Sequence, residues 1–203
     1  MKIVFIGAHG VPANYGGFET FVEEVSVGLV KKGYEIVVIG DANQQKVMNN
    51  LLEYKGVKLK YSRYMKTKNP LLFYLESLFM AMKEANVIYS CGSGVSYLAF
   101  LPRLFGKKSI TNVDGMGWVR TKYSPFTREL VKIEIGMSAL FSEYIVYDSE
   151  GMAEVFKKVF NRTRKGVVLE YGAYMNKFVD IDNKKEEHVL EKYNLMKGNY
   201  HLV

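Results

Sequence analysis

The sequence predicts an α/β fold, a Rossmann-like, doubly wound and mostly parallel sheet of six or seven strands. Two observations predict it. Short apolar runs, beginning with residues 3–6, alternate along the chain with segments of helical periodicity, the pattern of a parallel sheet with crossover helices. Glycines and acids gather directly after the apolar runs. In such a fold these positions form the carboxyl edge of the sheet, where ligands bind.

The first loop of this edge lies between a buried strand at residues 3–6 and a helix at residues 18–32, which Gly33 is placed to end. Gly16 and Gly17 stand directly before the helix. Two adjacent residues without side chains let backbone N–H groups approach a phosphate or a sugar closely. A tight turn that starts the helix explains the same pair without a ligand. The loop has neither G-x-G-x-x-G nor Gly-Lys-Ser/Thr, the common phosphate motifs.

The rest of the chain repeats the order of strand, turn and helix. Further strands are expected at residues 34–39, 57–61, 86–91, 108–113, 144–147 and 167–169. Further helices are expected at residues 44–54, 71–80, 95–105, 127–141 and 152–160. The alternation of apolar residues and lysines in residues 57–61 indicates a half-exposed strand near a sheet edge.

Polar and glycine residues of five turns are expected to line one crevice at the carboxyl edge. They are Gly16, Gly17, Gly92, Gly94, Asp114, Gly115, Asp148, Ser149 and Gly172. Ser149 also suits the N-cap of the helix at residues 152–160.

The composition changes after residue 178. We expect residues 1–178 to form one domain, and residues 179–203 to form a charged linker helix followed by the first strand of a second, truncated domain.

Charge and cysteine content narrow the function classes. The net charge is +7 and the pI is near 9.2, which indicates an anionic partner. Cys91 is the only cysteine, which favours a reducing, cytoplasmic setting, and the thiol is expected to be a buried apolar group. The three histidines are scattered, so no metal site is expected.

Two other functions remain open from the residues alone. Asp41 follows the second strand, where an acid can hold a ribose, and this suggests an NAD(P)-type oxidoreductase domain. A non-catalytic glycan-binding module is the other alternative.

Residues 10–24, GVPANYGGFETFVEE, carry a resemblance to a known family. The run resembles the opening of bacterial glycosyltransferases of the GT-B fold, retaining family four, in the branch of rhamnosyltransferases that build capsular and other surface polysaccharides. Members have two Rossmann-like domains facing a cleft. The resemblance implies that this chain is the acceptor-side domain, inactive by itself.

The resemblance also implies roles for individual residues. The glycine-rich loop of the family lies beside the donor diphosphate, which places Asn14, Gly16, Gly17 and Glu19 in the cleft, with Asp148, Ser149 and Gly172 at the same edge. Asp114 is implied as the catalytic residue that orients the donor sugar. The family branch continues Asp-Gly-Leu-Glu-Trp-Lys-Arg, whereas this chain has Gly117 in place of the acid. Trp118, Arg120 and Lys122 are implied in acceptor binding.

The implied reaction is transfer from a nucleotide sugar to a lipid-linked saccharide, with retention, without metal or cofactor and without nucleic acid. Such acceptors are membrane-bound. An anionic membrane surface is therefore expected to meet Lys66, Lys68, the helix at residues 71–80, Arg120, Lys122 and Arg128, as a peripheral contact of a cytoplasmic protein. A core helix covered on both sides is the alternative for residues 71–80.

Overall fold

The structure is a computed structural model that describes residues 1–14, 16–113, 115–160, 165–172 and 183–196. The chain divides into two compact units, Met1–Glu170 and Tyr171–Val203. The second unit contains one helix among its described residues, α7 (Asn183–Lys192), in the segment where a charged helix is predicted. The predicted domain limit at residue 178 and the predicted last strand at residues 201–203 lie outside the described residues.

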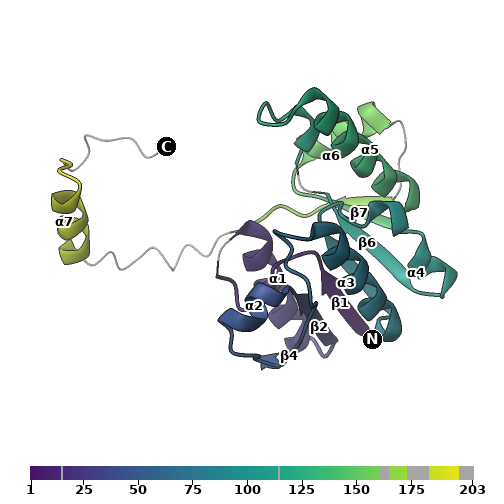
Figure 1. Cartoon of the computed structure of the whole chain (residues 1–203), viewed down its shortest axis with the longest axis horizontal. Helices are drawn as coiled ribbons and strands as arrows, with labels where there is room; N and C mark the ends of the chain where they lie inside the picture. Colours follow the sequence, from purple (N-terminus) through teal and green to yellow (C-terminus); the bar gives the residue numbers. More distant parts are fainter. Residues whose placement is uncertain (15, 114, 161–164, 173–182, 197–203) are drawn as a thin grey trace. The chain divides into compact units, whose positions relative to one another are not determined.

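The first unit is built on an eight-stranded sheet in the order β3-β4-β2-β1-β5-β6-β7-β8 (Figure 1). The strands are β1 (Lys2–Ile6), β2 (Glu35–Gly40), β3 (Glu53–Tyr54), β4 (Val57–Tyr61), β5 (Val87–Cys91), β6 (Lys108–Asn112), β7 (Tyr144–Tyr147) and β8 (Lys165–Val168). Every neighbouring pair is parallel except β3 and β4. The predicted doubly wound sheet is confirmed, and β4 lies next to the edge strand, as its alternation indicates.

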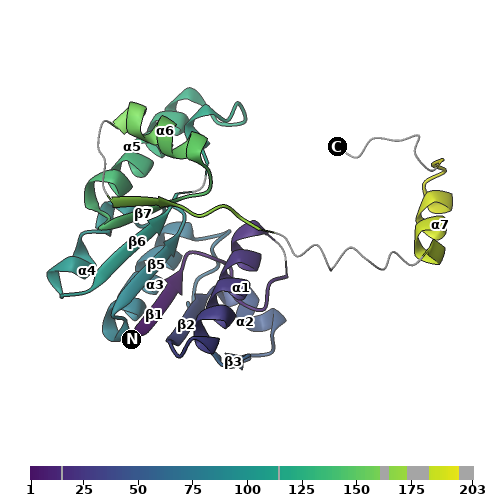
Figure 2. The ribbon, with the colours of Figure 1, turned by 180° about the vertical axis from the view of Figure 1, so that it is seen from behind.

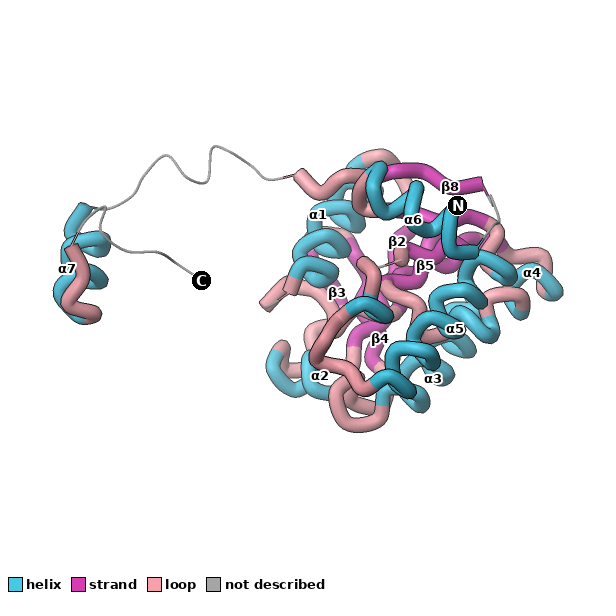
Figure 3. Tube along the Cα trace, turned by 90° about the horizontal axis from the view of Figure 1, so that it is seen from above, coloured by secondary structure: helices cyan, strands magenta, loops and turns pink. Residues whose placement is uncertain are grey.

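Helices cover both faces of this sheet. They are α1 (Gly17–Lys31), α2 (Ala42–Val47), α3 (Pro70–Glu84), α4 (Leu101–Leu104), α5 (Pro125–Phe141) and α6 (Glu150–Phe160), with short 3₁₀ turns η1 (Ser96–Leu98) and η2 (Gly117–Val119). Seen from behind, α1 lies in front of the sheet and α3 behind it (Figure 2). Seen from above, α3 and α5 lie on the face opposite α1 (Figure 3). This division is the one that right-handed crossovers require. The connection from β1 through α1 to β2 and the connection from β4 through α3 to β5 run across the sheet in opposite directions.

The core consists of the two faces of the central strands, because successive side chains of a strand point to opposite sides. On one face Phe5 and Val38 pack with Val22 of α1. On the other face Ile6 packs with Leu78 of α3. A third cluster joins α5 and α6 to β7, with Ile135, Ala139, Ile145, Tyr147, Met152 and Phe156 among its buried members. The buried strands β1, β2 and β5 therefore read as nearly continuous apolar runs.

The predicted helix at residues 44–54 is shorter than expected. Helix α2 ends at Val47, and Asn49 and Asn50 follow with φ of 47° and 58°, in the left-handed region that asparagine tolerates better than most residues. Lys55 and Gly56, with φ of 49° and 83°, then form the two-residue turn between β3 and β4. Positive φ at both central positions suits the twist of a hairpin.

The predicted helix at residues 95–105 is also wrong in part. The structure has η1 and the four-residue α4 in its place. Pro102 lies near the start of α4. A proline has no N–H to extend the hydrogen-bond ladder of a preceding turn, so a helix starts at this residue instead of running through it.

A matched pair of glycines tests the close contact between β1 and β5. Gly7 has a φ of 93°, and a side chain there would collide with the carbonyl oxygen of Cys91, whereas Gly28 in α1 has open space around it. We expect Gly7→Ala to lower the free energy of unfolding by about 2–4 kcal/mol. Gly28→Ala should raise it by about 0.5–1 kcal/mol. Urea denaturation measures both, and equal effects would contradict the contact.

Candidate functional site

The carboxyl edge brings together four of the five predicted turns. Strands β1, β5, β6 and β7 are consecutive neighbours in the sheet. Their carboxyl ends lead to Gly16 and Gly17, to Gly92 and Gly94, to the segment containing Gly115, and to Asp148 and Ser149. Parallel strands end at the same edge, so these segments lie next to one another along it. Gly172 belongs to the second unit, and Asp114 lies outside the described residues.

The β1–α1 loop (residues 7–16) is fixed along its flanks by polar side chains of helices. The backbone N–H of His9 donates to Oε1 of Glu19 at 2.8 Å, and that of Ala13 donates to Oε2 of Glu23 at 2.6 Å. The carbonyl oxygen of Pro12 accepts from Nε2 of Gln44 at 2.7 Å. These bonds give side-chain partners to backbone groups of the loop, which lies beyond the strand ladders of β1.

Glu19 contacts the backbone of this loop. Its side chain is buried in the first turn of α1, with one oxygen on the N–H of His9 and the other facing Gly16. The sequence places it correctly at the helix start, where a carboxylate also complements the helix dipole. Its contact with the backbone of the loop depends on tertiary structure.

Asp41 is an anchor of the same loop. Its Oδ1 accepts the N–H of Gln44 and so caps α2, and its Oδ2 accepts the N–H of Lys66 at 3.1 Å and lies 2.8 Å from Nδ1 of His9. Burial by itself raises the pKa of Asp41, but the bonds from His9, Gln44 and Lys66 outweigh it, so the pKa lies below its ordinary value. The ribose role suggested by the sequence does not fit a side chain that is fully buried with both oxygens occupied.

The tip of the loop, by contrast, is open. Asn14, Gly16 and Gly17 are exposed, and a side chain added at Gly17 would meet no atom within 4 Å. Gly16 is the N-cap of α1 and offers no side chain to the first N–H groups of that helix. Uncapped N–H groups at a helix start bind anions well. The tip can therefore admit a phosphate or a sugar.

The second glycine turn is packed more tightly. A side chain at Gly94 would collide with the ring of Tyr74, so Gly94 has a packing role. Ser93, in the same turn, hydrogen-bonds to Glu134 of α5. Burial raises the pKa of Glu134, and the Ser93 bond offsets this only in part. The hydroxyl of Tyr97 is buried without a hydrogen-bond partner among the described residues. Burial raises the pKa of Tyr97, and the charge of Glu134 raises it further.

The remaining predicted residues lie in the segments before α5 and α6. Ser149 accepts the N–H of Met152 at 3.3 Å and donates to Asp148 at 3.1 Å, so its predicted N-cap role is confirmed. Trp118 is half-buried and meets Phe160 edge-on at 5.7 Å, against the third core cluster. Arg120 is exposed beside Gly115. Lys122 is exposed, with its ammonium 5.2 Å from the ring of Tyr123.

Lys66 is a residue of this edge whose position the sequence did not reveal. Its backbone N–H donates to Oδ2 of Asp41, which places Lys66 at this edge. Burial raises the pKa of Cys91, Lys66 lowers it, and Glu19 raises it. The expected buried thiol is confirmed, because Cys91 belongs to the first core cluster. Lys66 therefore adds a positive charge to the edge where the open loop lies.

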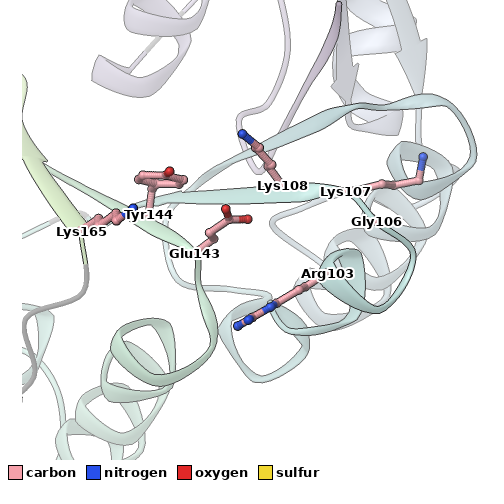
Figure 4. A pocket seen from close by; sticks show the side chains of 7 residues that line it. All are labelled: Arg103, Gly106, Lys107, Lys108, Glu143, Tyr144 and Lys165. Carbon is pink, nitrogen blue, oxygen red and sulfur yellow. The ribbon is translucent and has the colours of Figure 1, made fainter.

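A pocket of about 490 Å³ lies at the opposite edge of the sheet (Figure 4). Its lining includes Lys108, Tyr144 and Lys165, the first residues of β6, β7 and β8. Glu143 lies between Lys108 and Arg103 in this view. None of the predicted site residues lines this pocket. No cluster of three or more His, Cys, Asp or Glu suited to a metal occurs among the described residues.

Stability against pH tests the anchoring by Asp41. Because its pKa is lowered in the folded chain, its contribution to stability is complete above the ordinary carboxyl pKa and is lost as the pH falls through the folded value. We expect Asp41→Asn to destabilise the chain by about 1–3 kcal/mol at pH 7, with a difference that shrinks below about pH 4. Urea denaturation across this pH range measures it, with Glu53→Gln, an exposed acid, as the control. A pH-independent difference would contradict the ionic role.

Comparison with known proteins gives a family model for the first part of the chain and a fold for nearly all of it. Residues 1–61, from β1 through β4, match the model described as "Domain of unknown function (DUF1972)". No curated protein matches the sequence.

Three solved structures illustrate the similarity in fold. HepE of Anabaena in complex with UDP-glucose has a TM-score of 0.62 and 12% identity, over 96% of this chain and 50% of that chain. HepE in complex with UDP and glucose has a TM-score of 0.61, at the same identity and coverage. Arabidopsis thaliana UGT89C1 complexed with UDP has a TM-score of 0.50 and 11% identity, over 94% of this chain and 54% of that chain. The chain thus spans about half the length of these proteins and shares the Rossmann-like α/β fold of that part.

Proposed function

We propose that this chain is the acceptor-side half of a GT-B glycosyltransferase that moves a sugar from a nucleotide sugar to a saccharide acceptor. One observation carries the proposal. Asn14, Gly16 and Gly17 form an exposed tip poor in side chains, on a loop whose flanks are fixed by hydrogen bonds at the carboxyl edge. The structures of similar fold contain UDP or UDP-glucose, which supports a nucleotide sugar as the ligand class.

The loop has the properties that a donor diphosphate requires. A preorganised backbone loses little conformational entropy on binding, and the N–H groups at the start of α1, which no side chain caps, are available to donate to a phosphate. Lys66 supplies a cation at the same edge. As charge develops on the leaving diphosphate, such groups stabilise it. Donor contact is therefore assigned to Asn14, Gly16 and Gly17, with Lys66 added, while Glu19 holds the loop.

Finer features of the reaction follow from the resemblance of residues 10–24. We propose transfer with retention and without a metal, in which the diphosphate accepts the proton of the acceptor and no protein base is needed. Asp114 orients the donor sugar and stabilises positive charge near its anomeric carbon. Arg120 and Lys122, which follow Asp114 in the chain and are exposed, bind the acceptor. Trp118 offers the acceptor only the part of its ring that the core leaves uncovered.

We propose rhamnose as the transferred sugar and a lipid-linked saccharide as the acceptor, in the synthesis of a cell-surface polysaccharide. The partner surface is an anionic membrane, met from the cytoplasmic side. In this proposal a donor-binding half completes the enzyme, since the chain spans half the length of the similar structures. A screen of nucleotide sugars against lipid-linked acceptors with the whole protein identifies the donor.

A substitution at Gly17 separates a ligand role from a simple turn. The open space at this position accepts a side chain without a clash, but that side chain would occupy the space proposed for the diphosphate. We expect Gly17→Val to lower kcat/KM of transfer by the whole protein at least about tenfold, or about 1.4 kcal/mol, with an unchanged melting temperature. Gly28→Val, in the same helix and also in open space, is the control. An unchanged kcat/KM of the Gly17→Val variant would exclude the ligand role and leave only the role of Gly17 in the turn.

A second substitution tests Asp114. A carboxylate that stabilises charge in the transition state contributes several kcal/mol in a site that excludes water. We expect Asp114→Ala to lower kcat/KM of the whole protein by about a hundredfold or more, while the affinity for the nucleoside diphosphate alone stays within about threefold. Steady-state kinetics and calorimetry measure the two quantities. A kcat/KM within about threefold of the unsubstituted protein would exclude the role.

A further inference from the structure

The side chain of His9, in the β1–α1 loop, has one polar atom that the fold does not use. Its ring nitrogen Nδ1 lies 2.8 Å from Oδ2 of Asp41, and its backbone N–H donates to Oε1 of Glu19. The other ring nitrogen, Nε2, has no partner within the described residues and is not among the buried polar atoms that lack one. The side chain is 36% exposed. His9 therefore gives one ring nitrogen to the protein and leaves the other open to a ligand.

The carboxylate of Asp41 decides which ring nitrogen of His9 carries a proton. The pKa of Asp41 lies below its ordinary value, so this carboxylate is ionised at neutral pH and can only accept hydrogen bonds. Nδ1 of His9 must therefore donate to it. In such a ring Nε2 accepts a hydrogen bond when the ring is neutral and donates one when the ring is protonated. The protonated ring forms an ion pair with Asp41, and its Nε2 is then a charged donor.

The ring of His9 lies at the carboxyl edge, next to the open tip of the loop. Asp41 directly follows β2, the neighbour of β1 in the sheet, so the pair joins the ends of two adjacent strands. Glu19 connects His9 to the tip. One of its oxygens accepts the N–H of His9, and the other is the nearest atom to a side chain built on Gly16. A ligand with two phosphate groups at the tip would therefore lie beside the ring.

A second cationic residue is anchored to the same carboxylate oxygen. The backbone N–H of Lys66 donates to Oδ2 of Asp41 at 3.1 Å, the oxygen that also binds His9. Arg128, which the sequence suggested for a membrane surface, instead donates to two backbone carbonyl oxygens of the segment before α5, at 3.1 and 3.3 Å. One buried side chain thus fixes two cationic residues at the carboxyl edge. Charges that are already in place need no reorganisation when negative charge develops on a ligand.

We propose that His9 binds the leaving diphosphate in the proposed sugar transfer, through a hydrogen bond from Nε2 of its protonated ring. This role rests on the proposed function and adds a catalytic residue to it. During transfer the bond between the anomeric carbon and the diphosphate oxygen breaks, and its electron pair stays on that oxygen. The anomeric carbon forms a bond to the acceptor oxygen, and the proton of the acceptor passes to the diphosphate. His9 keeps its own proton and stabilises the negative charge.

Replacing His9 by asparagine removes Nε2 but keeps the contact with Asp41, because the amide N–H₂ takes the place of Nδ1. The probe is inorganic pyrophosphate, which contains the diphosphate without a base or a sugar. We expect His9→Asn in the whole protein to weaken pyrophosphate binding in calorimetry, and to lower kcat/KM of transfer, each at least about tenfold. The melting temperature should be unchanged. His188→Asn, at an exposed position of α7, is the control and should change neither quantity.

The pH dependence separates the ionic role of His9 from packing. We expect the ratio of the two pyrophosphate affinities, unsubstituted over His9→Asn, to be largest near pH 6 and to shrink as the pH rises to about 9. The sign follows because the neutral ring cannot donate from Nε2. The titration of pyrophosphate is common to both proteins and cancels in the ratio. The charged residues around His9, which are Asp41, Glu19 and Lys66, are also present in both.

Two outcomes would overturn this role. One is an affinity of His9→Asn for pyrophosphate within about twofold of the unsubstituted protein, and the other is a ratio of affinities that does not change with pH. A different outcome concerns the proposed function alone. If pyrophosphate binding depends on His9 as expected but the whole protein transfers no sugar from any nucleotide sugar, the contact with a diphosphate is supported and the proposed transfer is not.

Discussion

The structure around the candidate site depends on how the backbone of the β1–α1 loop finds hydrogen-bond partners. This loop leaves the middle of a parallel sheet, where the carbonyl oxygen of His9 still accepts from the N–H of Asp41 but the regular ladder between β1 and β2 has ended. Side chains of α1 and α2 supply the partners instead, through Glu19, Glu23 and Gln44. Because buried backbone groups without partners cost about 1–3 kcal/mol each, these contacts hold the flanks of the loop in one conformation. The residues Asn14, Gly16 and Gly17 at the tip stay exposed.

The sheet order then decides which segments can act together. Strands distant in sequence, β1 and β5, are neighbours, so the first glycine loop lies beside the turn that begins at Gly92. The loop from β4 returns across the same edge, where the backbone of Lys66 binds Asp41. One buried carboxylate therefore joins β2, the β1–α1 loop and the loop after β4. An open edge with fixed loops and a cation suits an extended anionic ligand better than an enclosed pocket would.

Much of the fold could be predicted because the periodicity of apolar residues is a local property. The strands and the long helices α1, α3, α5 and α6 lie where that pattern places them. The predicted helix limits were wrong at Asn49 and at Pro102. At both positions a backbone preference outweighs the apolar pattern: Asn49 lies just after the end of a helix, and Pro102 lies at the start of one. The two-residue strand β3 is too short to have a period at all.

The sequence by itself determined the fold class, the position of the open glycines at the carboxyl edge and the capping role of Ser149, because each depends on residues close together in the chain. Only the tertiary structure decided that Asp41 is a buried anchor, that Lys66 reaches the same edge, that Trp118 packs on Phe160, and that Phe126 and Ile133 of α5 are exposed. These facts depend on contacts between segments far apart in sequence. The chemical type of a side chain limits what it can bind, but the packing of distant segments determines which partners it contacts.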